Sequence, residues 1–264
     1  MQHKELLVDE ISVTRQDRIA RVSLNRPAVR NALTLAMWRE LTAIFSGFCA
    51  DEDVRAVVLT GAGDDFSVGA DISEFESIRL NSKQATDYEV AVDACSNAIA
   101  ALGKPVVAAI SGYCLGGGWH LSLACDFRFS DATASVGIPA AKLSIVYGVR
   151  SVQRLLALVG MVNAKRILFS GDRFGAAQAK AMGLIDEIHD DPIAAADSFL
   201  KGLANSAPLS IAGAKFMLNQ ISMGTGALDL AAAQALVDGA SESDDFREGR
   251  LAFAEKRAPR FRGR

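Results

Sequence analysis

The strongest constraint on the fold is a pattern that occurs twice: an unbroken apolar run of strand length, a turn of glycine and small residues, and then a helical segment. In the first unit the apolar run is 56–60, the turn is 66–71 and the helix is expected over 72–80. In the second, the run is 106–110, the turn is 112–118 and the helix continues from Trp119. Runs without polar alternation are typical of strands buried on both faces of a parallel sheet. The pattern therefore predicts an α/β core.

Both turns are suited to presenting backbone N–H groups. Small residues let a ligand lie against the main chain, and the first turn of a helix carries N–H groups without intrahelical partners. One such turn binds an anion, and two that face each other can hold a single oxyanion. Either turn taken alone could serve packing only. Because no G-x-G-x-x-G and no Gly-Lys-Ser/Thr is present, a dinucleotide or NTP site is not expected.

The rest of the chain extends this organisation. Residues 19–24 alternate in hydropathy and predict a strand, and Thr34 is expected to cap a helix with one apolar face. A second long helix is expected from Ser82 to the Gly103 and Pro105 breakers. Strands and helices alternate to about Glu187, and only helical patterning follows from Pro192. We therefore predict an α/β core over 1–191 and a helical part over 192–264.

Composition limits the kinds of site and the cellular location that we expect for the chain. Four cysteines without a C-x-x-C pair and three scattered histidines predict no metal site and a reducing, cytoplasmic location. Charged residues near the N-terminus and the lack of a long apolar run predict neither a signal peptide nor a membrane span. The net charge of −3 argues against nucleic acid. The last ten residues nevertheless carry a cationic cluster that predicts contact with an anion: Lys256, Arg257, Arg260, Arg262 and Arg264 against Glu255 alone.

Several motifs, in order and spacing, resemble the crotonase (enoyl-CoA hydratase/isomerase) superfamily. They begin with Leu24-Asn25-Arg26-Pro27 and Asn31-Ala32-Leu33, continue through the two turns and Ala124-Cys125-Asp126, and extend over 164–171, 176–185 and the terminal 253–257. The resemblance covers essentially the whole chain.

This resemblance implies a spiral of ββα units followed by a helical C-terminal domain that assembles homotrimers, commonly paired as hexamers. It implies an acyl-CoA substrate, with coenzyme A part of the substrate and no separate cofactor. The N–H groups of Ala70 and Gly117 would form an oxyanion hole for the thioester carbonyl. Further substrate contacts are expected at Arg26, Arg30, Gly69, Asp71, Ile72, Gly116, Pro139, Ala140, Phe253 and Lys256.

The chain departs from the family where hydration uses two glutamates. His120 occupies the first position and Ala140 the second. Water must be deprotonated as it attacks and the enolate carbon must be protonated, so hydration requires an acid and a base. His120 could supply one of them, or could be a packed helix residue. Tyr147 is a further catalytic candidate, as a hydrogen-bond donor. Glu74 and Glu76 could turn inward but more simply form a solvated face, and Asp71 could stabilise a helix start.

The sequence thus predicts an acyl-CoA enzyme that stabilises a thioester enolate, either a hydratase-like lyase or an isomerase. Two alternatives stay open. The same oxyanion hole could serve decarboxylation, thioester hydrolysis or C–C hydrolysis with His120 alone, or the chain could be a silent CoA-binding subunit.

Overall fold

The computed structural model describes residues 10–74, 82–143, 147–203 and 205–222, and 229–264 apart from 230, 233–234, 236–237, 240–241 and 256. Its centre is a sheet of six strands in the order β1-β2-β3-β4-β6-β9. These are β1 (Ile11–Gln16), β2 (Ile19–Leu24), β3 (Ala56–Gly61), β4 (Val106–Ile110), β6 (Phe127–Ser130) and β9 (Glu187–Ile188). The β1–β2 pair is antiparallel, and each following pair is parallel.

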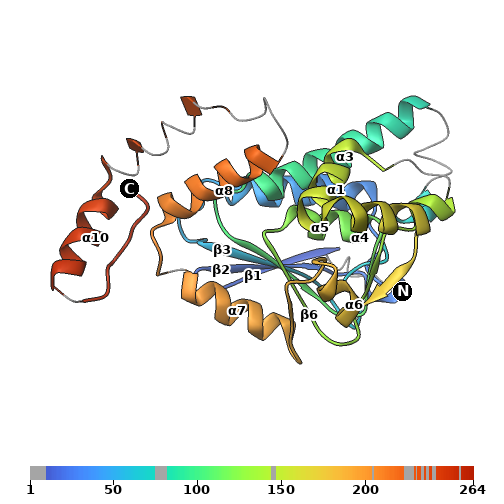
Figure 1. The fold of residues 1–264 in the computed structure, drawn as a ribbon, viewed down its shortest axis with the longest axis horizontal. Coiled ribbons are helices and arrows are strands. Elements are labelled where there is room, and N and C mark those ends of the chain that lie inside the picture. The colour runs from blue at the N-terminus through green and yellow to red at the C-terminus, as the bar shows by residue number, and fades with distance from the viewer. Residues whose placement is uncertain are drawn as a thin grey trace, which may run out of the picture.

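Helices cover both faces of this sheet, as Figure 1 shows, which explains the unbroken apolar runs. Val57 and Leu59 of β3 belong to the larger core, which also takes side chains from α1 (Leu35–Gly47), α3 (Ser82–Ala101) and α4 (Gly117–Ala124). Val58 of β3 and Val107 of β4 point the other way, toward α7 (Pro192–Leu203). Thr34 caps α1 as expected, because its Oγ1 accepts a hydrogen bond from Met37 N at 3.1 Å.

A smaller, three-stranded sheet stands beside the first. It has the order β5-β7-β8, from β5 (Tyr113–Leu115), β7 (Ser135–Gly137) and β8 (Arg173–Gly175). Isolated bridges pair Leu33 with Ala70 and Ser67 with Cys114, so the chain after β3 also runs along this layer. Successive turns of the chain thus place one segment in each sheet before a helix follows, which is the predicted spiral of ββα units.

The remaining helices complete the α/β arrangement. They are α5 (Val149–Ser170), α6 (Ala176–Ala181), α8 (Pro208–Ser222) and α10 (Asp244–Glu255), with short 3-10 turns η1 (Pro27–Val29), η2 (Ile72–Glu74) and η3 (Pro139–Leu143). The predicted helix over 72–80 begins as η2, and its remainder lies outside the described residues. Helices do follow Pro192, although α7 packs on the main sheet (Figure 1). No helix in the described part of the chain is long and apolar enough to cross a membrane.

A buried ion pair fastens α8 to the core. Lys215 Nζ lies 2.8 Å from Asp126 Oδ2 and donates a second hydrogen bond to Lys104 O at 3.0 Å. The same carboxylate accepts a hydrogen bond from Val106 N at 2.7 Å, so Asp126 joins α8 to the start of β4. Burial raises the pKa of Asp126, and the nearby Lys215 opposes that shift.

We expect Lys215→Met to lower the free energy of unfolding by roughly 3 kcal/mol, because it leaves the Asp126 carboxylate largely buried without its cation. Urea denaturation of the full chain measures this change. The matched control is Lys201→Met, which removes an exposed ion pair with Asp17 and should barely move the unfolding midpoint. Equal effects of the two substitutions would show that the Lys215–Asp126 pair contributes no more to stability than an exposed ion pair.

Candidate active site

Backbone hydrogen bonds join the two glycine-containing turns to each other. Phe66 N donates to Ser111 O and Ser67 N to Tyr113 O, both at 2.8 Å, and Leu115 N donates back to Ser67 O at 2.9 Å. The turns therefore run side by side as a short ladder, and their relative position is fixed by the main chain.

The orientation of the Ala70 amide follows from its bridge to Leu33. In this parallel bridge, Leu33 N donates to Gly69 O at 2.8 Å and Asp71 N donates to Leu33 O at 2.9 Å. The amides on either side of Ala70 are also occupied, because Gly69 N donates to Ser67 Oγ at 3.1 Å. The N–H of Ala70 itself points away from Leu33 and has no acceptor among the described residues.

The second turn leaves an equivalent donor. Gly116 adopts φ 49°, its N–H donates to Gly137 O at 3.0 Å, and its carbonyl accepts from His120 N at 2.9 Å. Gly117 begins α4, so its N–H has no intrahelical acceptor. It also has none elsewhere in the described part of the chain.

These two free amides lie close together. A Cβ built on Gly117 would lie 3.2 Å from Ala70 N, and a Cβ built on Gly69 would lie 2.9 Å from Gly117 N. Gly69 also adopts φ 101°, which side chains disfavour. Glycine at both positions therefore keeps the space between the two donors open. The structure therefore places Ala70 and Gly117 close together, and their catalytic role stays a prediction.

His120 lies one helical turn beyond Gly117 on α4 and is only 6% exposed. Its Nδ1 is 2.5 Å from Ser151 Oγ, and its buried Nε2 makes no hydrogen bond of good geometry with the described residues. Burial, and secondly the positive charge of Arg154, lowers the pKa of His120 to about 3. The imidazole is therefore neutral near pH 7.

An aromatic cluster surrounds this imidazole. The rings of Trp38 and Tyr147 each lie 6.1 Å from it, edge to face. Tyr147 donates a hydrogen bond from its hydroxyl to Gly116 O at 3.2 Å. Burial raises the pKa of Tyr147, so the phenol keeps its proton. The catalytic candidates His120 and Tyr147 therefore both lie beside the second turn.

Trp38 was not identified from the sequence as part of the site. Its Cζ2 atom would be 3.1 Å from a Cβ on Gly117, and its indole N–H donates to Tyr88 Oη at 3.0 Å. Trp38 falls on the buried face of α1, which a sequence pattern cannot separate from ordinary core.

The predicted CoA contacts are spread around the first turn. Arg26 pairs with Asp71 at 2.9 Å and with Glu10 at 3.0 Å, so its guanidinium braces the loop. The pKa of Asp71 is lowered by its hydrogen bond from Ser73 and then by Arg26, and its carboxylate accepts from Ser73 N at the start of η2, the predicted role at a helix start. Ile72 is 74% exposed. Arg30 extends over the Tyr113 ring, 5.0 Å from its centroid, with its side chain 58% exposed.

The other predicted contacts divide between described and undescribed positions. Pro139 opens η3, two residues after the Gly137 that is bonded to Gly116, and Ala140 is 7% exposed. Ala140 therefore contributes a buried methyl group and no ionisable group at this position. Lys256 and the side chain of Phe253 lie outside the described residues.

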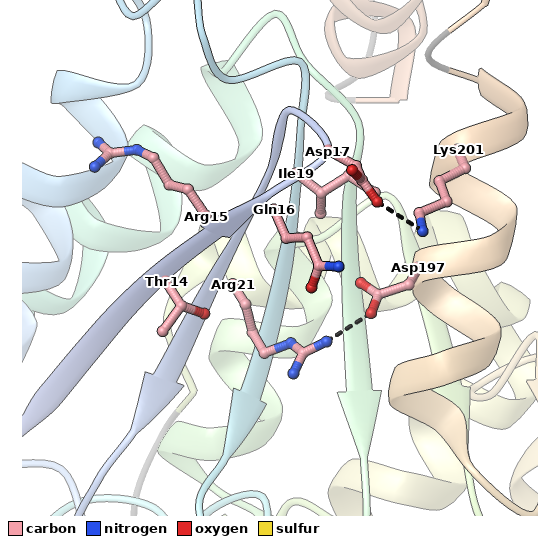
Figure 2. Close-up of a pocket in the computed structure, with 8 residues that line it drawn as sticks. All are labelled: Thr14, Arg15, Gln16, Asp17, Ile19, Arg21, Asp197 and Lys201. Carbon is pink, nitrogen blue, oxygen red and sulfur yellow. Dashed lines mark hydrogen bonds and ion pairs between the residues drawn. The ribbon is translucent and has the colours of Figure 1, made fainter.

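A polar pocket of about 180 Å³ lies elsewhere, between the β1–β2 hairpin and α7 (Figure 2). Its facing charges are already paired: Arg21 with Asp197 at 2.6 Å and Lys201 with Asp17 at 2.9 Å. None of its lining residues comes from the two turns. Separately, the described residues contain no group of three or more side chains suited to a metal ion.

Two unpaired amides, those of Ala70 and Gly117, thus lie close together within a spiral of ββα units. Comparisons with known proteins identify the family of this fold. The family model described as enoyl-CoA hydratase/isomerase matches residues 14–264. The chain is 32% identical over 259 residues to the 2,3-dehydroadipyl-CoA hydratase of Escherichia coli, covering 97% of this chain and 100% of that protein.

Solved structures give the same result. An enoyl-CoA hydratase/carnithine racemase from Magnetospirillum magneticum superposes with a TM-score of 0.90 at 33% identity, covering 97% of each chain. Enoyl-CoA hydratase from Bacillus anthracis superposes with a TM-score of 0.86 at 33% identity, covering 97% of this chain and 100% of that one. The chain belongs to the enoyl-CoA hydratase/isomerase (crotonase) family and is an enzyme that acts on acyl-CoA.

His120 should make stability depend on pH. Its pKa is lowered to about 3 in the folded protein, whereas an unfolded histidine titrates near 6.5. Between these values the unfolded chain binds more protons, so stability increases with pH and is lost as the pH falls, by up to about 1.4 kcal/mol per unit. His120→Gln should therefore flatten the change in unfolding free energy between about pH 5 and 6.5. Urea titrations that stay parallel for the two proteins would contradict a buried neutral His120.

Proposed function

We propose that the N–H groups of Ala70 and Gly117 together bind the thioester carbonyl oxygen of an acyl-CoA and stabilise its enolate. The supporting observation is that the two amides are close together and free: a Cβ on Gly117 would lie 3.2 Å from Ala70 N, and neither amide has an acceptor in the described chain. Enolate formation moves negative charge onto that oxygen. A preorganised pair of donors therefore binds the transition state more strongly than the ground state, and each donor is typically worth about 3 kcal/mol.

We expect the CoA part of the substrate to lie along the first turn. Ile72, next to Asp71, is exposed. The exposed Arg30 guanidinium lies 3.7 Å from Asp65, whereas Arg26 is bonded to two carboxylates at 2.9 and 3.0 Å. Arg30 is therefore the better candidate for a phosphate contact, with Arg26 holding the loop in shape. We propose Lys256 and Phe253 as further contacts. We also propose that the helical part over 192–264 assembles homotrimers, singly or paired as hexamers.

The reaction itself is proposed from the surroundings of the hole. Hydration or double-bond isomerisation is the reaction that family membership suggests first. A second candidate is favoured by two observations: Ala140 has no ionisable group, and His120 is neutral and tightly buried. Decarboxylation of an acyl-CoA with a carboxylate on Cα needs no side-chain base. The Cα–carboxylate bond breaks, its electron pair enters the thioester as the enolate, CO₂ leaves, and Cα then takes a proton from solvent.

The test is a mass-spectrometric screen of enoyl-, malonyl- and ketoacyl-CoA substrates with wild type, Gly117→Ala and Gly175→Ala. The Cβ in Gly117→Ala enters the space between the donors, so turnover should fall by about 10²-fold or more. Gly175 has nothing within 4 Å of a Cβ and an extended φ of −69°, so Gly175→Ala should retain activity. The product found by mass spectrometry identifies the reaction that the enzyme catalyses. If Gly117→Ala is folded by circular dichroism and still turns over substrate at the wild-type rate, the proposed oxyanion hole is refuted.

Restoring the missing carboxylates separates the candidate reactions. The double change His120→Glu and Ala140→Glu should raise hydration of enoyl-CoA above wild type, because it supplies an acid and a base beside an intact hole. The positive charge of Arg154 that disfavours a protonated histidine would favour an ionised carboxylate at the first position. The two single variants are the controls and should gain less. No gain in a folded double variant would show that the pocket, and not only the two side chains, differs from that of a hydratase.

A further inference from the structure

The contact between His120 and Ser151 is the least expected polar interaction near the proposed hole. Ser151 is the third residue of α5 and only 1% exposed, and its hydroxyl oxygen lies 2.5 Å from His120 Nδ1. No other hydrogen bond from this hydroxyl to the described residues is present. The ring's orientation is therefore controlled from α5, a helix that begins 32 residues after Gly117.

The two neutral forms of the imidazole differ in how many buried groups stay unpaired. If Nδ1 carried the proton, it would donate to Ser151 Oγ, leaving the hydroxyl proton without an acceptor and the Nε2 lone pair without a donor. If the hydroxyl donates to Nδ1, its proton is used and the ring proton sits on Nε2. Unpaired polar groups are costly when buried, so the second arrangement is the more stable one.

The groups around the ring favour its neutral form. The backbone of Val92 on α3 raises the pKa of His120, but burial and the charge of Arg154 lower it by more. Arg154, one turn after Ser151 on α5, is held by Ser96 Oγ and Asn97 Oδ1 at 3.0 Å each. Its fixed positive charge disfavours a second proton on the ring. The ring is therefore neutral, and the Ser151 hydroxyl at Nδ1 leaves its proton on Nε2, which has no hydrogen-bond partner among the described residues.

We propose that Ser151 is a positioning residue: its hydroxyl donates to His120 Nδ1 and fixes the imidazole as the neutral Nε2–H form. In this form His120 has no free lone pair and does not accept the proton of an attacking water. It supplies only a ring N–H beside the aromatic cluster. The inference deepens the proposed function at the same site, because it assigns the chain to reactions that the hole can support without a histidine base.

Nitrogen NMR of the full-length protein with labelled histidines tests this proposal. Long-range correlation spectra show which ring nitrogen carries the proton, and the His120 signals are identified by their loss in His120→Gln. The expected result is a protonated Nε2 and an unprotonated Nδ1, unchanged between about pH 5 and 8. A proton on Nδ1, or titration within that range, would overturn the proposal.

Variants at Ser151 separate positioning from packing. Ser151→Ala removes the donor and should let a second signal set with protonated Nδ1 appear, whereas Ser151→Thr keeps the hydroxyl and should restore the wild-type pattern. The matched control is Ser130→Ala, a buried serine on β6 without a hydrogen-bond partner for its hydroxyl among the described residues, and it should leave the His120 signals unchanged. An unaltered pattern in folded Ser151→Ala would refute the role of Ser151. None of these spectra depends on turnover, so the result stands apart from the test of the oxyanion hole.

Discussion

The short backbone ladder between the two turns is the constraint on which the site depends. Its hydrogen bonds run from Phe66 to Ser111, from Ser67 to Tyr113 and back from Leu115 to Ser67. Each turn comes from a different unit of the spiral, and the ladder holds their free amides close together. The neighbouring amides of Asp71 and Gly116 donate to main-chain carbonyls and that of Gly69 donates to Ser67 Oγ, whereas the amides of Ala70 and Gly117 stay free among the described residues.

The side chains around these amides are consistent with a low-dielectric site. Trp38 and Tyr147 pack edge to face on His120, and burial keeps the imidazole neutral and the phenol protonated. Hydrogen bonds to a developing oxyanion are stronger in such surroundings than in water. The charged groups of the first turn stay at its outer side, where Arg26 and Asp71 brace the loop. Charge stabilisation at the proposed hole therefore falls to the backbone.

The sequence predicted the features that depend on neighbouring residues and missed those that depend on distant ones. The apolar runs around Val57 and Val107 identified buried strands, and the glycines identified both turns, because strand burial and turn geometry leave local patterns. Trp38, Tyr88 and Ser151 could not be assigned to the site, since each lies on a helix face that looks like ordinary core. The role of Lys215 was hidden for a similar reason: one lysine on a helix predicts a solvated side chain until its buried partner Asp126 is known.

Helix α4 has different attachments at its two ends. Gly117 opens it, and Asp126, which receives Lys215 from α8, follows two residues after its last residue, Ala124. Eight residues of α-helix span only about 12 Å, so the two attachments are near each other. The Lys215–Asp126 ion pair therefore holds the chain just beyond the helix whose first amide is that of Gly117, although α8 itself supplies no part of the proposed hole.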